Sequence, residues 1–148
     1  MDATKRIKKR RARGTAQLFE QVARRILEKR HRDDLHAAQW SALRYFQRAG
    51  RQTANVIGLS QYLGNTSGST SRTARSLVDR ALLTVSPAEH DARSVTFRLT
   101  PEGEATLAED PMLEIAAILD TLPPQELALL SKTLDTIQTE LLKRRTPE

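Results

Sequence analysis

The sequence contains no cysteine, which excludes disulfide bonds, thiolate metal sites and redox sensing through a thiol. It also contains no apolar run close to the ~20 residues needed to cross a membrane. Its first residues are polar and basic, without the apolar stretch of a secretory signal. These absences predict a cytoplasmic protein that does not enter a membrane.

Motifs of catalysis and metal binding are missing as well. The sequence has no nucleophile elbow, no phosphate-cradling glycine loop and no HExxH pattern. His31 and His36 are five residues apart, which places them on different faces of a helix, and His90 is distant in sequence. Surface or capping roles suit these histidines better than metal ligation. We therefore expect no enzyme, no metal and no cofactor.

The net charge of +6 is unevenly distributed. Residues 1–13 hold seven basic residues against one acidic residue, and residues 35–98 hold eight arginines against three acidic residues. Residues 99–148 instead hold ten acidic residues against four basic ones. A basic middle and an acidic C-terminal part predict that one face meets a polyanion and that another face has a different task.

The basic segment 1–13 lacks apolar periodicity, so we expect a disordered arm there. Such an arm either follows phosphates or a DNA minor groove, or it only solvates the chain. Behind it, Leu18, Val22 and Ile26 predict a helix from Thr15 to about His31.

The middle of the chain predicts short helices followed by a hairpin. Asp33 or Asp34 can cap a second helix that Gly50 ends. Helices at 54–63 and 67–81, separated by Gly64 and a small-polar turn, have the helix-turn-helix form. Alternating apolar residues then predict two strands around a turn at 87–91. The residues expected to face the core are Trp40, Leu43, Phe46, Val56, Leu59, Leu63, Thr70, Ala74, Leu77, Ala81, Leu83, Val85, Val95, Phe97 and Leu99.

Prolines divide the rest of the chain into helices. Thr100 caps a helix whose first residue is Pro101. Pro111 should interrupt that helix, Asp110 can cap its restart, and Pro123-Pro124 should end it. The last helix should run to about Arg145. It carries a heptad seam of the kind that commonly meets a partner, although it could also be internal core. The seam consists of Leu127, Leu130, Leu134, Ile137 and Leu141.

The helix at 67–81 carries the residues best suited to read DNA. Ser69, Arg72, Thr73 and Ser76 follow helical spacing and should share one exposed face. Arginine can bind guanine bidentately, and serine and threonine can bind bases or phosphates. The alternative is an ordinary solvated helix face.

The predicted hairpin places Asp91 and Arg93 two residues apart near its tip. Residues at this spacing share a strand face, so the carboxylate can hold the guanidinium in one orientation. An arginine held in this way can enter a narrow minor groove. The alternative is a surface ion pair without a function.

In this order and spacing, the residues resemble the MarR family over roughly 15–143. The matching pieces are Gln39-Trp40 with Leu43, the stretch Leu59-Ser60-Gln61-Tyr62-Leu63-Gly64, Ser71 and Arg72, Ala81-Leu82-Leu83, Asp91-Ala92-Arg93-Ser94, and Leu99-Thr100-Pro101-Glu102-Gly103. The resemblance implies that the helix at 67–81 reads the major groove and that Arg93 contacts the minor groove. It also implies dimerisation through the terminal helices and a small, often aromatic or amphipathic, effector between the dimer helices and the DNA-binding lobe.

We therefore expect a mainly α fold with a small β-hairpin wing: a winged helix-turn-helix with N- and C-terminal dimerisation helices. Its domains would be a basic flexible arm at 1–14 and a single domain at 15–148. That domain would hold the DNA-binding lobe at 35–100 and dimerisation helices at 15–32 and 101–145. The expected DNA contacts are Ser67, Ser69, Arg72, Thr73, Arg75, Ser76, Asp91 and Arg93, and the expected dimer contacts are Leu18, Val22 and the heptad seam.

The expected function is sequence-specific binding of double-stranded DNA at a pseudo-palindromic operator by a homodimer, with repression relieved by the effector. Two alternatives remain open at this point. One is a non-specific chromatin-type DNA binder led by the basic segment. The other is a protein–protein interaction module, because a winged-helix scaffold does not fix function.

Overall fold

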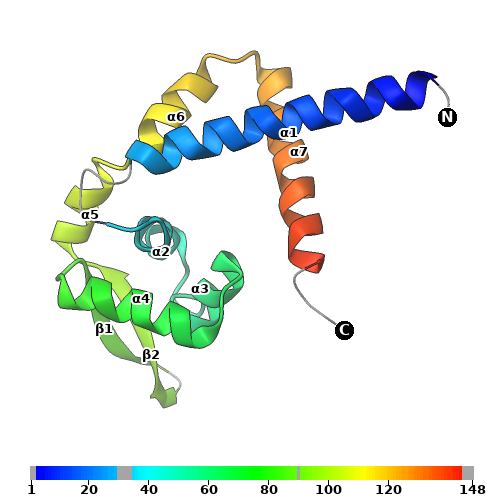
Figure 1. Cartoon of the computed structure of the whole chain (residues 1–148). Coiled ribbons are helices and arrows are strands. Elements are labelled where there is room, and N and C mark those ends of the chain that lie inside the picture. Colours follow the sequence, from blue (N-terminus) through cyan, green and yellow to red (C-terminus); the bar gives the residue numbers. More distant parts are fainter. Residues whose placement is uncertain (1–2, 30–34, 90, 145–148) are drawn as a thin grey trace. The chain divides into compact units, whose positions relative to one another are not determined.

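The computed structural model describes residues 3–29, 35–89 and 91–144 (Figure 1). The chain divides into two compact units, residues 1–37 and 38–148. The mainly helical class with one hairpin is confirmed. The elements in chain order are α1 (Ala3–Lys29), α2 (Ala37–Arg48), α3 (Val56–Leu63), α4 (Ser67–Asp79), β1 (Leu83–Ala88), β2 (Asp91–Leu99), α5 (Pro101–Leu107), α6 (Met112–Asp120) and α7 (Pro124–Lys143).

Helix α1 corrects the expectation of a disordered N-terminal arm. The helix is continuous from Ala3 to Lys29, so the basic residues 3–13 form its first turns. Alanine, lysine and arginine are all strong helix formers, and this stretch contains no proline. The lack of apolar periodicity predicts disorder, but the high helix propensity of these residues makes the segment helical. The expected caps Asp33 and Asp34, and also His31 and His90, lie outside the described residues.

The core of the second unit is formed around α2. Trp40 and Leu43 are fully buried and Phe46 is nearly so, as their spacing of three predicts. The Phe46 ring lies 5.4 Å from that of Phe97, which joins α2 to the hairpin. The indole Nε1 of Trp40 is buried without a hydrogen-bond partner in the described part of the chain. Packing of apolar area is therefore what holds this tryptophan in place.

Helices α3 and α4 form the predicted helix-turn-helix, and each has a side-chain cap. The Asn55 side chain accepts from the N–H of Gly58 and begins α3. Gly64 ends that helix at φ 63°, in the left-handed region that favours glycine. Thr66 then caps α4 through the N–H of Ser69. These caps fix the short turn between the two helices.

The end of α4 differs from our prediction. Ala81 was expected on the buried face of a helix reaching residue 81, but α4 ends at Asp79. Ala81 is exposed and has φ 58°, a conformation that alanine seldom adopts. A left-handed residue here turns the chain from α4 directly into β1, so that Leu82 and Leu83 are buried.

Strands β1 and β2 pair antiparallel as the wing. Leu83 pairs with Leu99 and Val85 with Phe97, and the pairing becomes irregular between Pro87 and Ala88. The expected long turn at 87–91 is therefore shorter, because Ala88 still pairs with Asp91.

Burial along the wing falls towards its tip. Leu83 and Phe97 are buried, whereas Val85 and Val95 are exposed. The two valines were expected to face the core. Val95 lies closer to the tip than Phe97, whereas Val85 lies directly opposite Phe97 and is still exposed on β1. Only the base of the wing contributes to the core.

A junction at Thr100 joins α4, β1 and α5. The Thr100 hydroxyl donates to the carbonyl oxygen of Ala81 at 2.6 Å and accepts from the N–H of Gly103 at 3.0 Å. The N–H of Thr100 donates to the carbonyl oxygen of Leu82 at 3.2 Å. Gly103 permits this approach, since a Cβ there would lie 2.2 Å from the Leu82 oxygen. The predicted cap of α5 thus also holds the start of the wing.

Asp110 caps the restart of the helix after Pro111, as predicted. Its Oδ1 accepts from the N–H of Met112 at 2.8 Å. The same carboxylate accepts two hydrogen bonds from Arg44 of α2, one through Nε and one through Nη2 at 2.7 Å. The Asp110 side chain is only 7% exposed and that of Arg44 is 21% exposed. This ion pair connects α2 to the α5–α6 turn.

Helices α6 and α7 leave many large apolar side chains uncovered. Of the predicted seam on α7, Leu127 and Leu130 are half-buried. Leu134, Ile137 and Leu141 are exposed to 37%, 40% and 58%. On α1, Leu18 and Val22 are likewise exposed. The exposed members of this set are thus not part of a core within the described chain, whereas Leu127 and Leu130 are partly covered by it.

Candidate nucleic-acid interface

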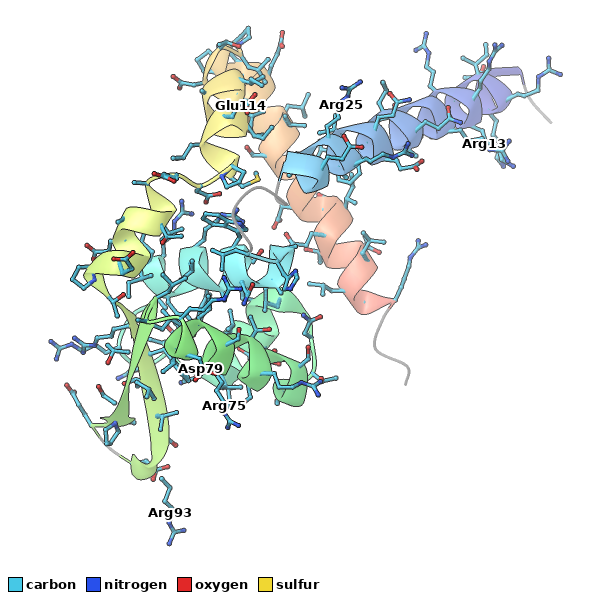
Figure 2. The ribbon with its side chains drawn as sticks, turned by 60° about the vertical axis from the view of Figure 1, so that its left-hand side comes forward. Arg13, Arg25, Arg75, Asp79, Arg93 and Glu114 are labelled. Carbon is cyan, nitrogen blue, oxygen red and sulfur yellow. The ribbon has the colours of Figure 1, made fainter. Side chains whose placement is uncertain are left out.

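Helix α4 has one buried and one outward face. Thr70, Ala74 and Leu77 are fully buried. Since each residue turns the helix by 100°, the opposite face is formed by Gly68, Arg72, Arg75 and Asp79, all of which are exposed. Figure 2 shows Arg75 pointing outward from this helix.

The outward face is rotated from the one that the sequence predicted. Ser69, Thr73 and Ser76 are half-buried and lie on a flank of α4. Ser76 accepts a hydrogen bond from Nε2 of Gln39 at 2.9 Å and donates to the Thr73 carbonyl oxygen at 2.8 Å. Thr73 donates to the Ser69 carbonyl oxygen at 3.2 Å. The expectation of one exposed face shared with Arg72 is therefore wrong for these hydroxyl residues.

Arginines dominate the outward face. Neither Arg72 nor Arg75 forms an ion pair or a side-chain hydrogen bond within the described residues. Ser67 is exposed in the first turn, where free backbone N–H groups favour a negative partner. The outward face thus presents two guanidinium groups, with Asp79 as its single carboxylate, and Ser67 adds one exposed hydroxyl at the start of the helix. This composition suits phosphate and guanine acceptors.

Asp91 acts at the wing tip in a different way from our prediction. Its carboxylate accepts from the backbone N–H of Arg93 at 2.9 Å and from the Ser94 hydroxyl at 2.8 Å. These two hydrogen bonds, the one from Arg93 first, lower the pKa of Asp91. The Arg93 guanidinium is not bound by Asp91 and points away from the wing (Figure 2). Asp91 therefore shapes the backbone that presents Arg93 and leaves the charge of the guanidinium free.

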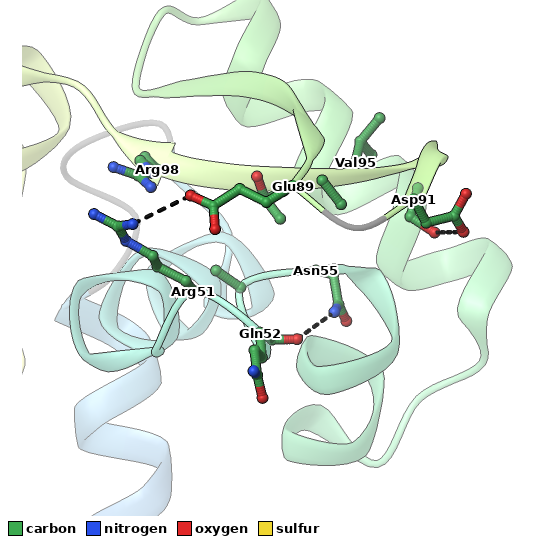
Figure 3. Close-up of a pocket in the computed structure, with 11 residues that line it drawn as sticks. Arg51, Gln52, Asn55, Glu89, Asp91, Val95 and Arg98 are labelled. Atoms are coloured by element: carbon green, nitrogen blue, oxygen red, sulfur yellow. Dashed lines mark hydrogen bonds and ion pairs between the residues drawn. The ribbon is translucent and has the colours of Figure 1, made fainter.

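A cleft of about 370 Å³ lies between the loop after α2 and the wing (Figure 3). Arg51, Gln52 and Asn55 line it on the loop side, and Glu89 and Arg98 line it on the wing side. An ion pair of 3.1 Å between Arg51 and Glu89 crosses it, with both side chains well exposed. An exposed pair of this kind adds little stability. This cleft is not the place between dimer helices and DNA-binding lobe where the resemblance implies an effector.

Two long-range contacts and the orientation of one helix face were missed from the sequence. Gln39 holds Ser76, and the pair formed by Arg44 and Asp110 joins two helices. The rotated arginine face could have been found by counting 100° steps from the apolar stripe. The two long-range contacts had no signal, because hydrogen-bond partners 37 and 66 residues apart follow from the fold alone.

Two negative findings concern the described residues alone. No group of three or more histidine, aspartate or glutamate side chains in them is placed to hold a metal ion. No helix among them combines the length and the apolar character needed to span a membrane.

A helix-turn-helix followed by a two-stranded wing, with an arginine-bearing second helix and an arginine at the wing tip, defines the winged helix-turn-helix class. Residues 33–94 match the model of the MarR family, in agreement with the resemblance predicted from the sequence. No curated protein matches the chain. The class predicted from the sequence, a DNA-binding transcription regulator and not an enzyme, agrees with this family.

Solved structures support the fold over most of the chain. A MarR family transcription regulator aligns with TM-score 0.69 and 19% identity, covering 97% of each chain. A variant of S. aureus MepR bound to an oligodeoxyribonucleotide aligns with TM-score 0.58 and 16% identity, covering 86% of this chain and 97% of the other. MepR bound to ethidium bromide aligns with TM-score 0.53 and 17% identity, covering 85% and 95%. At these identities the likeness concerns the fold.

Proposed function

We propose that this protein is a homodimeric, sequence-specific DNA-binding repressor that a small molecule releases from its operator. The observation that carries the proposal is the outward face of α4, with Arg72 and Arg75 exposed and unpaired in the described part of the chain. An arginine fork on a helix of this kind reads guanine O6 and N7 in the major groove. The oligonucleotide-bound MepR, which shares the fold, supports DNA as the partner.

A second copy of the chain is the partner that we assign to the terminal helices. Leu18 and Val22 on α1, and Leu134, Ile137 and Leu141 on α7, are apolar side chains left exposed within the chain. The burial of apolar area drives association, and the 3-4-3-4 spacing on α7 is that of a helix–helix seam. A symmetric dimer would place two copies of α4 about one DNA turn apart, which requires a pseudo-palindromic operator.

A small aromatic or amphipathic effector completes the proposal. The ethidium-bound MepR shows that a protein of this fold can hold an aromatic cation. We assign the effector to the space between the dimer helices and the DNA-binding lobe, as the family resemblance implies. Release of DNA then requires that the effector binds the DNA-incompetent arrangement of the dimer more tightly than the competent one.

Two variants and a control test the base-reading role of α4. The DNA probe is a duplex selected from a random-sequence library by the wild-type protein. We expect Arg72→Ala and Arg75→Ala each to weaken binding by about 1–3 kcal/mol, roughly 5-fold to 150-fold, and to relax preference at one position per half-site. Lys132→Ala on α7 removes one exposed positive charge elsewhere and should leave affinity nearly unchanged.

The same titrations against a scrambled duplex separate the alternatives. Specific recognition requires the selected duplex to bind ~10³-fold or more tightly than the scrambled one. Equal affinity for both duplexes would identify a non-specific chromatin-type binder. A protein that selects no duplex at all would favour the interaction module. Folded Arg72→Ala and Arg75→Ala proteins with wild-type affinity would refute the role of this face.

A further inference from the structure

The first turns of α1 form a cationic helix that the function proposed above does not use. Seven lysines and arginines fall between residues 3 and 14, and the described residues there include no acidic one. None of the seven forms an ion pair within the described chain. We call this set the basic segment, and it consists of Lys5, Arg6, Lys8, Lys9, Arg10, Arg11 and Arg13.

The positive charge surrounds the helix on all sides. Because each residue advances the helix by 100°, the four consecutive cations from Lys8 to Arg11 span a full turn. All of the segment's side chains are exposed, and Figure 2 shows Arg13 extending into solvent. Like charges three and four residues apart repel one another along the helix. A polyanion that binds the segment would relieve this repulsion.

The apolar stripe of α1 stops where the basic segment begins. Leu18 and Val22 belong to a stripe with spacings of three and four. Continued towards the N-terminus, the same stripe passes through Thr15 and then meets Arg11 and Lys8. Burying these charges against a second copy of the chain in an apolar helix–helix seam would cost a large desolvation free energy. The basic segment is therefore not an extension of the proposed dimer contact.

A membrane surface is also a poor partner for the basic segment, because the segment has no apolar face. Helices that lie on membranes need an apolar face to sink between the headgroups. Ile7, 56% exposed, is the only large apolar side chain in the segment. A phosphate backbone requires no such face, because the gain comes from neutralising phosphates and releasing their counterions.

We propose that the basic segment binds the phosphate backbone of double-stranded DNA as a helix and without reading sequence. This inference rests on the proposed function, because it supposes that the protein is held on DNA by its winged helix lobe. A rigid helix about 10 Å wide with its side chains fits against phosphates, and unlike an extended arm it does not enter a minor groove about 6 Å wide. The segment would add salt-sensitive affinity to any DNA sequence alike.

The test replaces all seven basic residues with glutamine, which has a similar helix propensity. A matched control exchanges every lysine of the segment for arginine and every arginine for lysine, so that the charge is kept. The probes are the duplex selected by the wild-type protein and its scrambled counterpart, titrated over a range of salt concentrations. Circular dichroism checks that both variants keep the helix content of the wild type.

About three of the seven cations face a bound duplex at once. The slope of log affinity against log salt concentration should therefore be less steep in the glutamine variant, by about two to three per protomer. Affinity near physiological salt should fall on the order of tenfold to a hundredfold for both duplexes, with their ratio unchanged. The charge-keeping control should match the wild type.

An unchanged salt slope in the glutamine variant would overturn the proposal. So would a charge-keeping control that loses affinity, because the contact would then depend on side-chain identity. Binding of the wild type, but not of the glutamine variant, to phosphatidylglycerol vesicles, with no effect on DNA, would assign the segment to membranes instead. The failure of the proposed function looks different, because Arg72→Ala and Arg75→Ala would then also leave DNA affinity unchanged.

Discussion

The ion pair between Arg44 and Asp110 should determine how firmly α2 is joined to the start of α6. Asp110→Ala removes two interactions at once: the charge that meets the guanidinium and the acceptor for the N–H of Met112. Asp110→Asn keeps an acceptor for that N–H and removes only the charge. The two variants therefore separate the helix cap from the ion pair.

The magnitude follows from burial. Breaking a fully buried ion pair costs about 3–5 kcal/mol, because a charge is left without its partner. Arg44 is 21% exposed and can turn towards water, so a smaller loss applies. We expect Asp110→Ala to lower the free energy of unfolding by about 2–3 kcal/mol, of which the cap accounts for about 1. Asp110→Asn should then cost about 1–2 kcal/mol.

Urea unfolding followed by tryptophan emission measures these values. Trp40 is the single tryptophan and is fully buried, so its emission shifts when the core opens. All variants must be compared at one protein concentration, because dimerisation contributes to apparent stability. Arg44→Met and the double variant complete a cycle whose coupling should be about 1–2 kcal/mol. Additive single losses, or an Asp110→Ala protein as stable as the wild type, would refute the reasoning.

Three other perturbations follow from the structure. Gly58→Ala should clearly lower the urea midpoint of unfolding, because the new Cβ would lie 2.2 Å from a tyrosine hydroxyl and 2.4 Å from a backbone oxygen. Gly68→Ala is the control and should be neutral or stabilising, because its Cβ would meet nothing within 4 Å. Asp91→Ala should loosen the wing tip. Acid should loosen the wing tip only below pH 3.8, because the lowered pKa of Asp91 keeps its carboxylate charged down to that pH. Amide NMR shifts followed against pH test this, and a midpoint at or above 3.8 would contradict it. Replacing both Leu134 and Ile137 with Asp should dissociate the proposed dimer and abolish tight operator binding, and a folded, DNA-binding dimer in sedimentation would move the interface elsewhere.

The elements whose signals are local were predictable from the sequence. The capping contacts of Thr66, Gly64 and Thr100 lie within a few residues of each of them, and the helix ends that they set agree with the structure. The spacing of Trp40, Leu43 and Phe46 likewise identified the buried side of α2.

Predictions that depended on distant neighbours were less accurate. Val85 and Val95 alternate as core residues do, but nothing in their spacing shows that the fold buries Phe97 and leaves both valines exposed. Ser76 was grouped with Arg72 because both fit helical spacing, whereas Ser76 lies on the flank of α4 and its hydroxyl is bound by Gln39, which is distant in sequence. The helical state of residues 3–13 was missed for another reason, since the lack of apolar periodicity was given more weight than helix propensity.

The contacts at Thr100 also determine how motion passes through the DNA-binding lobe. One hydroxyl bonds to the carbonyl oxygen after α4 and to the first turn of α5, and the adjoining N–H holds the residue before β1. Gly103 packs directly on the Leu82 oxygen, so that backbone meets backbone between α5 and the residue before the wing. We therefore expect a tilt of α5 to move the end of α4 and the base of the wing together, so that a small rotation near Thr100 becomes a larger displacement of Arg93 at the wing tip.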